Sequence, residues 1–220
     1  MAVLDAVEIY RFFHIGDDET AALRGVSLSV DAGELVALVG PSGSGKSTLV
    51  ACLTGLDEPD GGWVAVNGNR LTRRSESLRA RLRAQNFGIM LQSDNLFQHL
   101  TVEENIRFQM QVVGKLDTAR MASLLEAVGM QHRAKSYPRS LSGGEIARAA
   151  LATAIAADPP IVIADEPTAE VDAQTEQLLF ELFDKRKQNG KATLLSTHSK
   201  ALASRADRIV RLRDGRTSDA

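Results

Sequence analysis

The sequence contains a single cysteine, few aromatic residues and no long apolar run. Cys52 alone cannot form a disulfide within the chain, so a disulfide-stabilised scaffold is excluded and a reducing compartment is expected. No stretch approaches about 18 uncharged apolar residues, the length that predicts a membrane-spanning helix. Residues 1–11 carry acidic side chains and lack an apolar core, so we expect no signal peptide.

A strong net charge is also lacking. Lys and Arg total 26 against 28 Asp and Glu, a net charge of −2, which excludes a globally basic nucleic-acid binder but not a local basic patch. The arginine-rich stretch 70–83 is such a patch, and it predicts either a solvated helix face or a contact with anionic headgroups or an acidic loop of a membrane partner. Nucleic acid is a third alternative, although no aromatic residue is interleaved for base stacking.

Short apolar runs alternate with helical patterns along the 220 residues. Residues 3–30 and 63–66 predict short strands, the former at a sheet edge. A continuous apolar run at 35–39 is typical of a strand buried on both faces, and further buried strands are predicted at 161–164, 193–197 and 208–212. Helices are predicted at 46–55, 103–113, 118–128, 146–157 and 174–188. This alternation predicts a parallel sheet with helices on both faces, and a mostly helical insertion over about 78–157.

The most specific motif fills every fixed position of the phosphate-loop pattern G-x-x-x-x-G-K-[ST], and reads Gly40-Pro41-Ser42-Gly43-Ser44-Gly45-Lys46-Ser47. Its glycines let the backbone approach phosphates, and its amides at a helix N-terminus favour an anion. Lys46 would neutralise the β- and γ-phosphates, and the Ser47 hydroxyl would bind Mg²⁺. The alternative, a flexible glycine–serine turn, is disfavoured by the buried strand before the motif and the helix after it.

Two acids close the second buried strand. Asp165 and Glu166 follow 161–164 directly, and acids at the mouth of a buried strand are costly unless they meet a cation. We therefore expect Asp165 to hold Mg²⁺ and Glu166 to orient and polarise the attacking water. Alternatively, the two acids only open a loop, which Pro167 would favour.

The segment Leu141-Ser142-Gly143-Gly144-Glu145 precedes an alanine-rich helix. Ser142 and Glu145 have the spacing of a capping box, so the segment could be no more than a well-capped helix start. Alternatively, Ser142, Gly143 and Gly144 form a second anion cradle at a helix N-terminus. Since the phosphate loop already encloses one phosphate chain, a second cradle makes most sense if it faces a nucleotide held by another chain.

Together these motifs resemble those of the ATP-binding-cassette ATPases over essentially the whole chain, with Gln92 and His198 at the expected places in the order. The resemblance implies an α/β fold in a single domain, 1–220. Its RecA-like P-loop nucleotide-binding core and N-terminal antiparallel β-subdomain would occupy 1–89 and 156–220. An inserted α-helical subdomain with the signature motif would occupy 90–155.

The resemblance also implies roles for individual residues, with ATP and Mg²⁺ as cofactors. The nucleotide-binding segment extends to Thr48. Gln92 resembles the glutamine that contacts Mg²⁺ and couples the site to a membrane partner, and His198 resembles the switch histidine at the γ-phosphate. Asp172 resembles the acid that crosses the dimer interface.

The adenine platform is predicted from the aromatic cluster Tyr10-Arg11-Phe12-Phe13. Phe13 lies where the family usually places its stacking aromatic, and Tyr10 is the alternative. Strand alternation would put Phe12 on the opposite face, in the core.

The resemblance finally implies partners and a location. We expect a second copy or a paralogous ATPase subunit and a separate permease, so that the chain is cytoplasmic and peripheral at the inner face of the membrane, with no nucleic acid bound. The sequence is most similar to the lipoprotein-release, cell-division and macrolide-export branch, although Ile146-Ala147-Arg148, Thr153, 169–171 and Ser199 depart from the usual pattern. Alternatives are a soluble cassette ATPase acting on DNA or ribosomes and a phosphate-loop kinase, which would not need 141–145 or His198.

Overall fold

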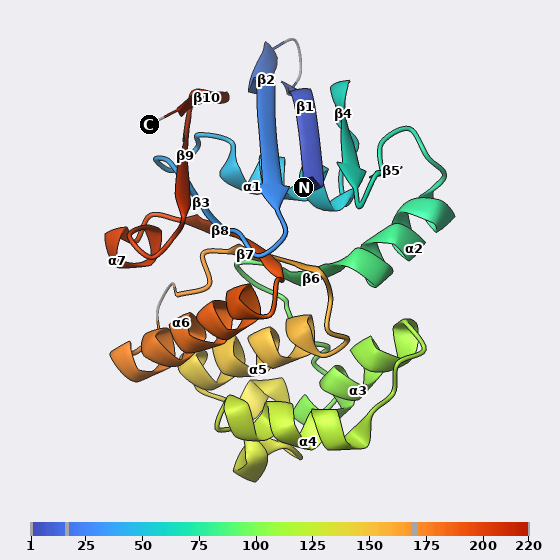
Figure 1. Ribbon diagram of the computed structural model, residues 1–220, viewed down its shortest axis with the longest axis vertical. Helices are drawn as coiled ribbons and strands as arrows, with labels where there is room; N and C mark the ends of the chain where they lie inside the picture. The colour runs from blue at the N-terminus through green and yellow to red at the C-terminus, as the bar shows by residue number, and fades with distance from the viewer. Residues whose placement is uncertain (1, 16–17, 169–170, 220) are drawn as a thin grey trace.

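A computed structural model describes residues 2–15, 18–168 and 171–219, and contains two sheets with helices packed on them (Figure 1). The smaller sheet is antiparallel, in the order β2-β1-β4-β5. Its strands are β1 (Ala2–Ile15), β2 (Asp18–Asp31), β4 (Gly61–Val66) and β5 (Asn69–Arg70). It is the predicted N-terminal antiparallel layer.

The larger sheet has the order β10-β9-β3-β8-β7-β6. All neighbours pair in parallel except β10, which is antiparallel to β9. The strands are β3 (Leu35–Val39), β6 (Phe87–Met90), β7 (Ile161–Asp165), β8 (Ala192–Thr197), β9 (Arg208–Arg213) and β10 (Arg216–Asp219). The predicted parallel sheet is confirmed, with β7 and β8 fully buried. The prediction that 208–212 is also a buried strand is wrong: in β9 Val210 and Leu212 are buried but Arg211 is exposed, because arginines alternate with apolar residues along this strand.

Helices cover both faces of this parallel sheet, as predicted. On one face α1 (Lys46–Thr54) packs between β7 and β8 of the large sheet and β2 of the small one. On the other face α5 (Gly143–Ile155) and α6 (Ala173–Gln188) contact β6 and β8, with α3 (Val102–Val112) and α4 (Thr118–Ala127) outside them. The short α7 (Lys200–Ala203) follows β8.

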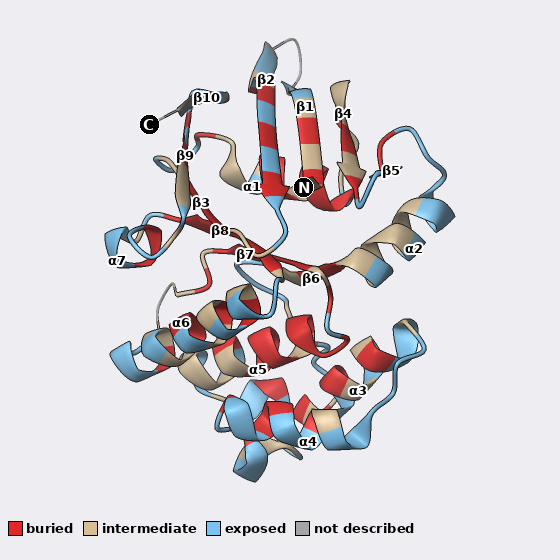
Figure 2. Cartoon of the chain, viewed as in Figure 1, coloured by how far each residue is buried: buried red, intermediate tan, exposed pale blue. Residues whose placement is uncertain are grey.

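Two apolar cores result, one on each face of the large sheet (Figure 2). One unites the small sheet with α1, and includes Leu4, Leu53 and Ile163. Cys52 belongs to this core, where burial raises the pKa of its thiol to about 12. The other joins α3–α6 to the sheet through residues such as Leu151 and Leu195.

The structure corrects the predicted helical stretch 78–157, because β6 interrupts it. Helix α2 (Glu76–Asn86) ends where β6 begins, and β6 then pairs with β7. A Cβ atom on Gly88 would lie 2.1 Å from the carbonyl oxygen of Ala154, so glycine lets α5 approach the strand closely. Strand β10 and helix α7 were not predicted either.

Candidate functional site

The predicted site residues converge because four parallel strands end at the same edge of the large sheet. The phosphate loop follows β3, His198 follows β8, Asp165 and Glu166 close β7, and Gln92 follows β6. Ligands of open α/β sheets bind outside the carboxyl ends of the strands. A cavity of about 650 Å³ lies there, lined by Phe13, Ala22, Gly40, Pro41, Ser42, Gly43, Gly45, Lys46, Ser47, Thr48, Gln92, Asp165, Glu166 and His198.

The phosphate loop needs glycine where neighbouring backbone crowds it. A Cβ atom on Gly40 would lie 2.2 Å from the carbonyl oxygen of Leu212. Gly45 precedes α1 with a φ of 103°, and its Cβ atom would lie 2.6 Å from the carbonyl oxygen of Ala22. The loop therefore turns tightly into α1, and the N-terminus of this helix faces the cavity.

Lys46 is folded back on its own loop. Its ammonium group donates hydrogen bonds to the carbonyl oxygens of Gly40, at 2.8 Å, and Pro41, at 3.2 Å. These carbonyls hold the cation at the cavity wall, where it supplies positive charge for an anionic ligand.

Asp165 is a buried carboxylate that fits a cation. The residue is 4% exposed, and among the described residues its Oδ1 atom has no hydrogen-bond partner. A buried anionic oxygen without a partner is unfavourable, and a cation in the cavity would remove this cost. Ser47 and Gln92 line the same cavity with further oxygen atoms.

The donor set fits Mg²⁺ better than a metal held by protein alone. The described residues contain no cluster of three or more His, Cys, Asp and Glu side chains suited to a metal. Mg²⁺ commonly uses only one or two protein carboxylates and completes its shell with phosphate oxygens and water. A single carboxylate beside a hydroxyl and an amide is therefore appropriate for an ion that arrives with a nucleotide.

Glu166 and His198 are in direct contact. The Nδ1 atom of His198 lies 2.9 Å from Oε2 of Glu166, and the backbone N–H of His198 donates to the same oxygen at 3.3 Å. The Glu166 side chain is 12% exposed, whereas that of His198 is 75% exposed. Glu166 also has a φ of 51°, which is uncommon for a residue other than glycine. The backbone thus turns sharply to aim this carboxylate into the cavity.

Ser142, Gly143 and Gly144 do not line the cavity of the phosphate loop. The Ser142 hydroxyl accepts a hydrogen bond from the Glu145 N–H, and the Glu145 carboxylate accepts one from the Ser142 N–H at 2.8 Å, so the capping box exists. Gly143 lines a second cavity of about 400 Å³, and Gln92 and Glu166 line both cavities. The signature segment is thus adjacent to the phosphate site but outside it.

Asp172 caps helix α6 within its own chain. Its carboxylate accepts hydrogen bonds from the Thr175 N–H at 2.8 Å and the Thr175 hydroxyl at 3.0 Å. Arg148 donates to the same hydroxyl at 2.5 Å, and a Cβ atom on Gly144 would lie 2.9 Å from Asp172. The Asp172 cap was not predicted, although the D-x-x-T spacing is a capping signal that could have indicated it. The contact of Arg148 with Thr175, which links α5 to α6, has no such local signal.

The aromatic cluster differs partly from the prediction. Phe13 is 39% exposed and lines the cavity, whereas Tyr10 does not line it. Phe12, predicted to be in the core, is only half-buried, and its ring stacks on that of Tyr10 at 6.5 Å between centroids. The register between β1 and β2 shifts between Arg11 and Phe12, which breaks the strict alternation on which the prediction depended.

The arginine-rich stretch is partly neutralised inside the chain. Arg79 forms ion pairs with Glu58 and Glu76, each at 2.6 Å, and Arg83 pairs with Glu76 at 3.1 Å. Arg73, Arg74 and Arg81 are exposed. The predicted solvated helix face is therefore confirmed for Arg79, Arg81 and Arg83 on α2, whereas Arg70 lies in β5 and Arg73 and Arg74 precede the helix.

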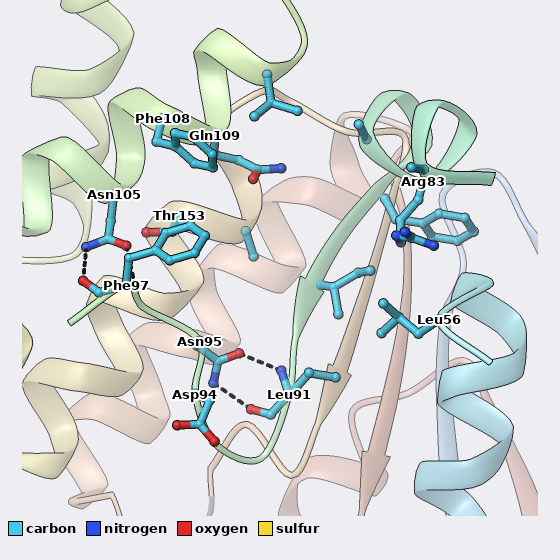
Figure 3. A pocket seen from close by; sticks show the side chains of 16 residues that line it. Leu56, Arg83, Leu91, Asp94, Asn95, Phe97, Asn105, Phe108, Gln109 and Thr153 are labelled. Atoms are coloured by element: carbon cyan, nitrogen blue, oxygen red, sulfur yellow. Dashed lines mark hydrogen bonds between the residues drawn. The ribbon is translucent and has the colours of Figure 1, made fainter. Parts of the chain in front are cut away.

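A groove of about 540 Å³ lies between α2, the segment after β6, and α3 (Figure 3). Phe97, Phe108 and Val112 line it and are exposed. The side-chain amide of Asn95 bonds to the backbone N–H and carbonyl of Leu91, both at 2.6 Å. The segment 91–97 thus runs from Gln92 at the phosphate cavity to the floor of the groove.

Comparison with known proteins identifies the class. A sequence model described as ABC transporter matches residues 23–169. An uncharacterised ABC transporter ATP-binding protein of Thermotoga maritima is 40% identical over 217 residues, which are 97% of this chain and 93% of the relative. A similarly described protein of Mycobacterium tuberculosis is 40% identical over 93% of this chain and 84% of the relative.

Solved structures that are similar to this chain support the same family. A dimeric ATP-binding cassette in a post-hydrolysis state, bound to ADP and Pi, superposes with a TM-score of 0.93 at 30% identity, over 98% of this chain and 96% of that one. A dimeric bacterial ABC transporter cassette gives a TM-score of 0.92 at 30% identity, with the same coverage. The chain therefore belongs to the ABC transporter family. It is an ATP-binding subunit of this family, that is, an ATPase, and it has the predicted α/β cassette fold.

Proposed function

We propose that this chain powers a separate membrane permease, by closing head to tail with a second ATPase subunit around two ATP molecules. The observation that carries this proposal is the apolar groove connected to Gln92 by the segment 91–97, because it joins the hydrolytic site to an exposed surface. Within the described ranges, no helix has the length and apolar character needed to cross a bilayer. Dimeric cassettes among the similar structures support the second subunit, which is a copy of this chain or a paralogue.

In this proposal the phosphate loop, Gly40–Thr48, holds the triphosphate of ATP, with Lys46 at the β- and γ-phosphates. Phe13 stacks on the adenine. Ser47, Gln92 and Asp165 would hold Mg²⁺, which when bound supplies charge neutralisation at the phosphates. Asp172 lies at the subunit interface, and Ser142, Gly143 and Gly144 close on the nucleotide of the opposite subunit.

Hydrolysis in this proposal depends on the contact between Glu166 and His198. Glu166 accepts a proton from the attacking water, and its carboxylate is already aimed into the cavity. His198 holds this carboxylate at 2.9 Å and is exposed enough to reach the γ-phosphate. Charge that develops on the phosphoryl oxygens is stabilised by Lys46 and the amides at the N-terminus of α1.

The helical segment 90–155 is proposed to be the subdomain that carries both the permease groove and the signature motif. The exposed rings of Phe97 and Phe108 contact each other edge to face at 5.1 Å, so together they present an apolar floor to a permease segment.

We also propose that the subunit belongs to the lipoprotein-release, cell-division or macrolide-export branch of the family and is peripheral at the inner face of the membrane.

A co-purification experiment tests the permease proposal. Phe97→Asp places a charge in the groove and should abolish recovery of a multi-span protein from native membranes, while ATP binding survives. Leu116→Asp is the matched control, because Leu116 is 51% exposed, Phe97 is 50% exposed and only Phe97 lines the groove. Recovery of DNA or ribosomes in place of a multi-span protein would contradict the proposal and favour the soluble cassette alternative.

A further inference from the structure

Arg11 lies against the ring proposed to receive the adenine. It precedes Phe13 by two residues on β1. The guanidinium carbon of Arg11 is 4.9 Å from the centroid of the Phe13 ring. This distance is within the range of a cation–π contact, in which the cation packs on a ring face.

Two carboxylates fix the Arg11 guanidinium in this position. Asp57 accepts hydrogen bonds from its Nε atom at 2.8 Å and from its second terminal nitrogen at 3.0 Å, a bidentate pair. Asp60 accepts from the remaining terminal nitrogen at 3.2 Å, and also from the backbone N–H of Phe12 at 2.7 Å. The Arg11 side chain is only 22% exposed. The guanidinium is therefore a fixed group rather than a mobile surface charge.

The anchoring carboxylates connect the aromatic ring to the phosphate loop. Asp57 and Asp60 lie in the segment that follows α1, and α1 begins at Lys46 in the phosphate loop. The Asp57 N–H itself bonds to the carbonyl oxygen of Ala51 in α1. Arg11 thus joins strand β1, which carries Phe13, to the helix that carries the phosphate cradle.

We propose that Arg11 is a positioning residue for nucleotide binding: packed on Phe13 and held by Asp57 and Asp60, it fixes the ring so that adenine stacks on it while the triphosphate occupies the phosphate loop. The proposal rests on the proposed role of Phe13. Loss of Arg11 lets the half-exposed ring rotate, and ATP then loses part of its stacking contact. The binding of ligands that lack a base is not affected by the loss of Arg11.

Binding of two probes tests this proposal. Arg11→Gln should weaken ATP binding by about two- to tenfold in calorimetric titrations, and should leave binding of inorganic triphosphate unchanged. The control is Arg70→Gln, because the Arg70 guanidinium lies 5.6 Å from the Trp63 ring, away from the cavity. Equal weakening of ATP and inorganic triphosphate would overturn the proposal, since it would show a general electrostatic or folding effect.

A double-mutant comparison distinguishes failure of this inference from failure of the Phe13 assignment. If Arg11 acts through the ring, Arg11→Gln should have no further effect on ATP binding in a Phe13→Leu background. An undiminished effect in that background would overturn the positioning role. If Phe13→Leu alone leaves ATP binding unchanged, the platform itself is misassigned and both proposals fall. If Phe13→Leu weakens ATP binding but Arg11→Gln does not, only the inference about Arg11 is wrong.

Discussion

At the scale of single residues, the site consists of groups whose local environment is incomplete without a ligand. Asp165 has a buried oxygen atom without a partner among the described residues, and the Lys46 ammonium donates its hydrogen bonds to carbonyls of its own loop. Glu166 has a left-handed backbone conformation beside His198. Such strain at a non-glycine residue persists where the surrounding structure enforces it, commonly at functional sites.

Glu166→Gln should abolish turnover while ATP binding is retained. Glutamine keeps the size of the side chain and a hydrogen-bonding oxygen but cannot accept the proton of the attacking water. Loss of one positioned general base lowers rates by about 10²–10⁴. Phosphate release measures the rate, and a sizing column with ATP should show a trapped dimer. Glu126→Gln, on the exposed side of α4, is the control, and wild-type turnover in Glu166→Gln would refute the assignment.

At the scale of elements, helix N-termini organise the site. The phosphate loop leads into α1, the signature segment caps α5, and Asp172 caps α6. Hydrogen bonds from backbone amides hold the pKa of Glu145 and that of Asp172 below their usual values. The Glu145 carboxylate accepts from the N–H of the N-cap residue Ser142, and the Asp172 carboxylate accepts from the Thr175 N–H in the first turn of α6. Arg133 lowers the pKa of Glu145 further through a 2.8 Å contact.

The stability contributed by Glu145 should therefore depend on pH. Because its pKa in the folded state lies below the ordinary value of 4.5, the carboxylate stabilises the fold above that pH, and this contribution is lost as pH falls through the folded value. Glu145→Gln should remove about 0.3–1 kcal/mol at pH 7 through the lost charge at the helix N-terminus.

Thermal unfolding measures this difference. A loss of about 1 kcal/mol lowers Tm by about 2–4 °C in a chain of this size. The Tm gap between wild type and Glu145→Gln should be largest near neutral pH and should shrink below pH 4.5. Glu126→Gln serves again as control, since Glu126 lies in the last turn of α4 rather than at a helix start. A gap that stays constant down to acid pH would contradict this account.

The elements also show what the sequence could and could not predict. The buried strand β7 was predictable because its residues 161–164 form a continuous apolar run bounded by turn signals. β6 has four residues, too few for a periodic pattern, and only its pairing with β7 reveals it. Phe12 was misplaced because a register shift in β1 is not visible in an alternation of residue types.

At the scale of the whole molecule, the convergence of the motifs was predictable because parallel strands place their carboxyl ends at one edge. Contacts between elements were not predictable from the sequence. The link from Arg148 through Thr175 to Asp172 depends on how α5 crosses α6, and the pairing of Arg11 with Asp57 depends on how β1 meets the segment after α1. Such packing follows from tertiary structure rather than from local spacing.

The position of the signature segment makes a prediction for the assembled molecule. Ser142, Gly143 and Gly144 lie outside the phosphate cavity of their own chain, so in the proposed head-to-tail dimer each complete site combines Lys46 of one chain with Gly143 of the other. Gly143→Asp would place a carboxylate against a γ-phosphate, and like charges in a partly desolvated site repel strongly. Lys46→Ala would weaken nucleotide binding directly. Each variant alone should therefore be inactive.

Mixing the two variants should restore part of the activity. A dimer of one Gly143→Asp chain and one Lys46→Ala chain contains one site with both groups intact and one site with both damaged. At equal concentrations with random pairing, about half of the dimers are mixed. ATP hydrolysis in the mixture, compared with each variant alone and with wild type, measures the complementation. Full activity of Gly143→Asp alone, or no activity in a mixture shown to contain mixed dimers, would exclude sites shared between two chains.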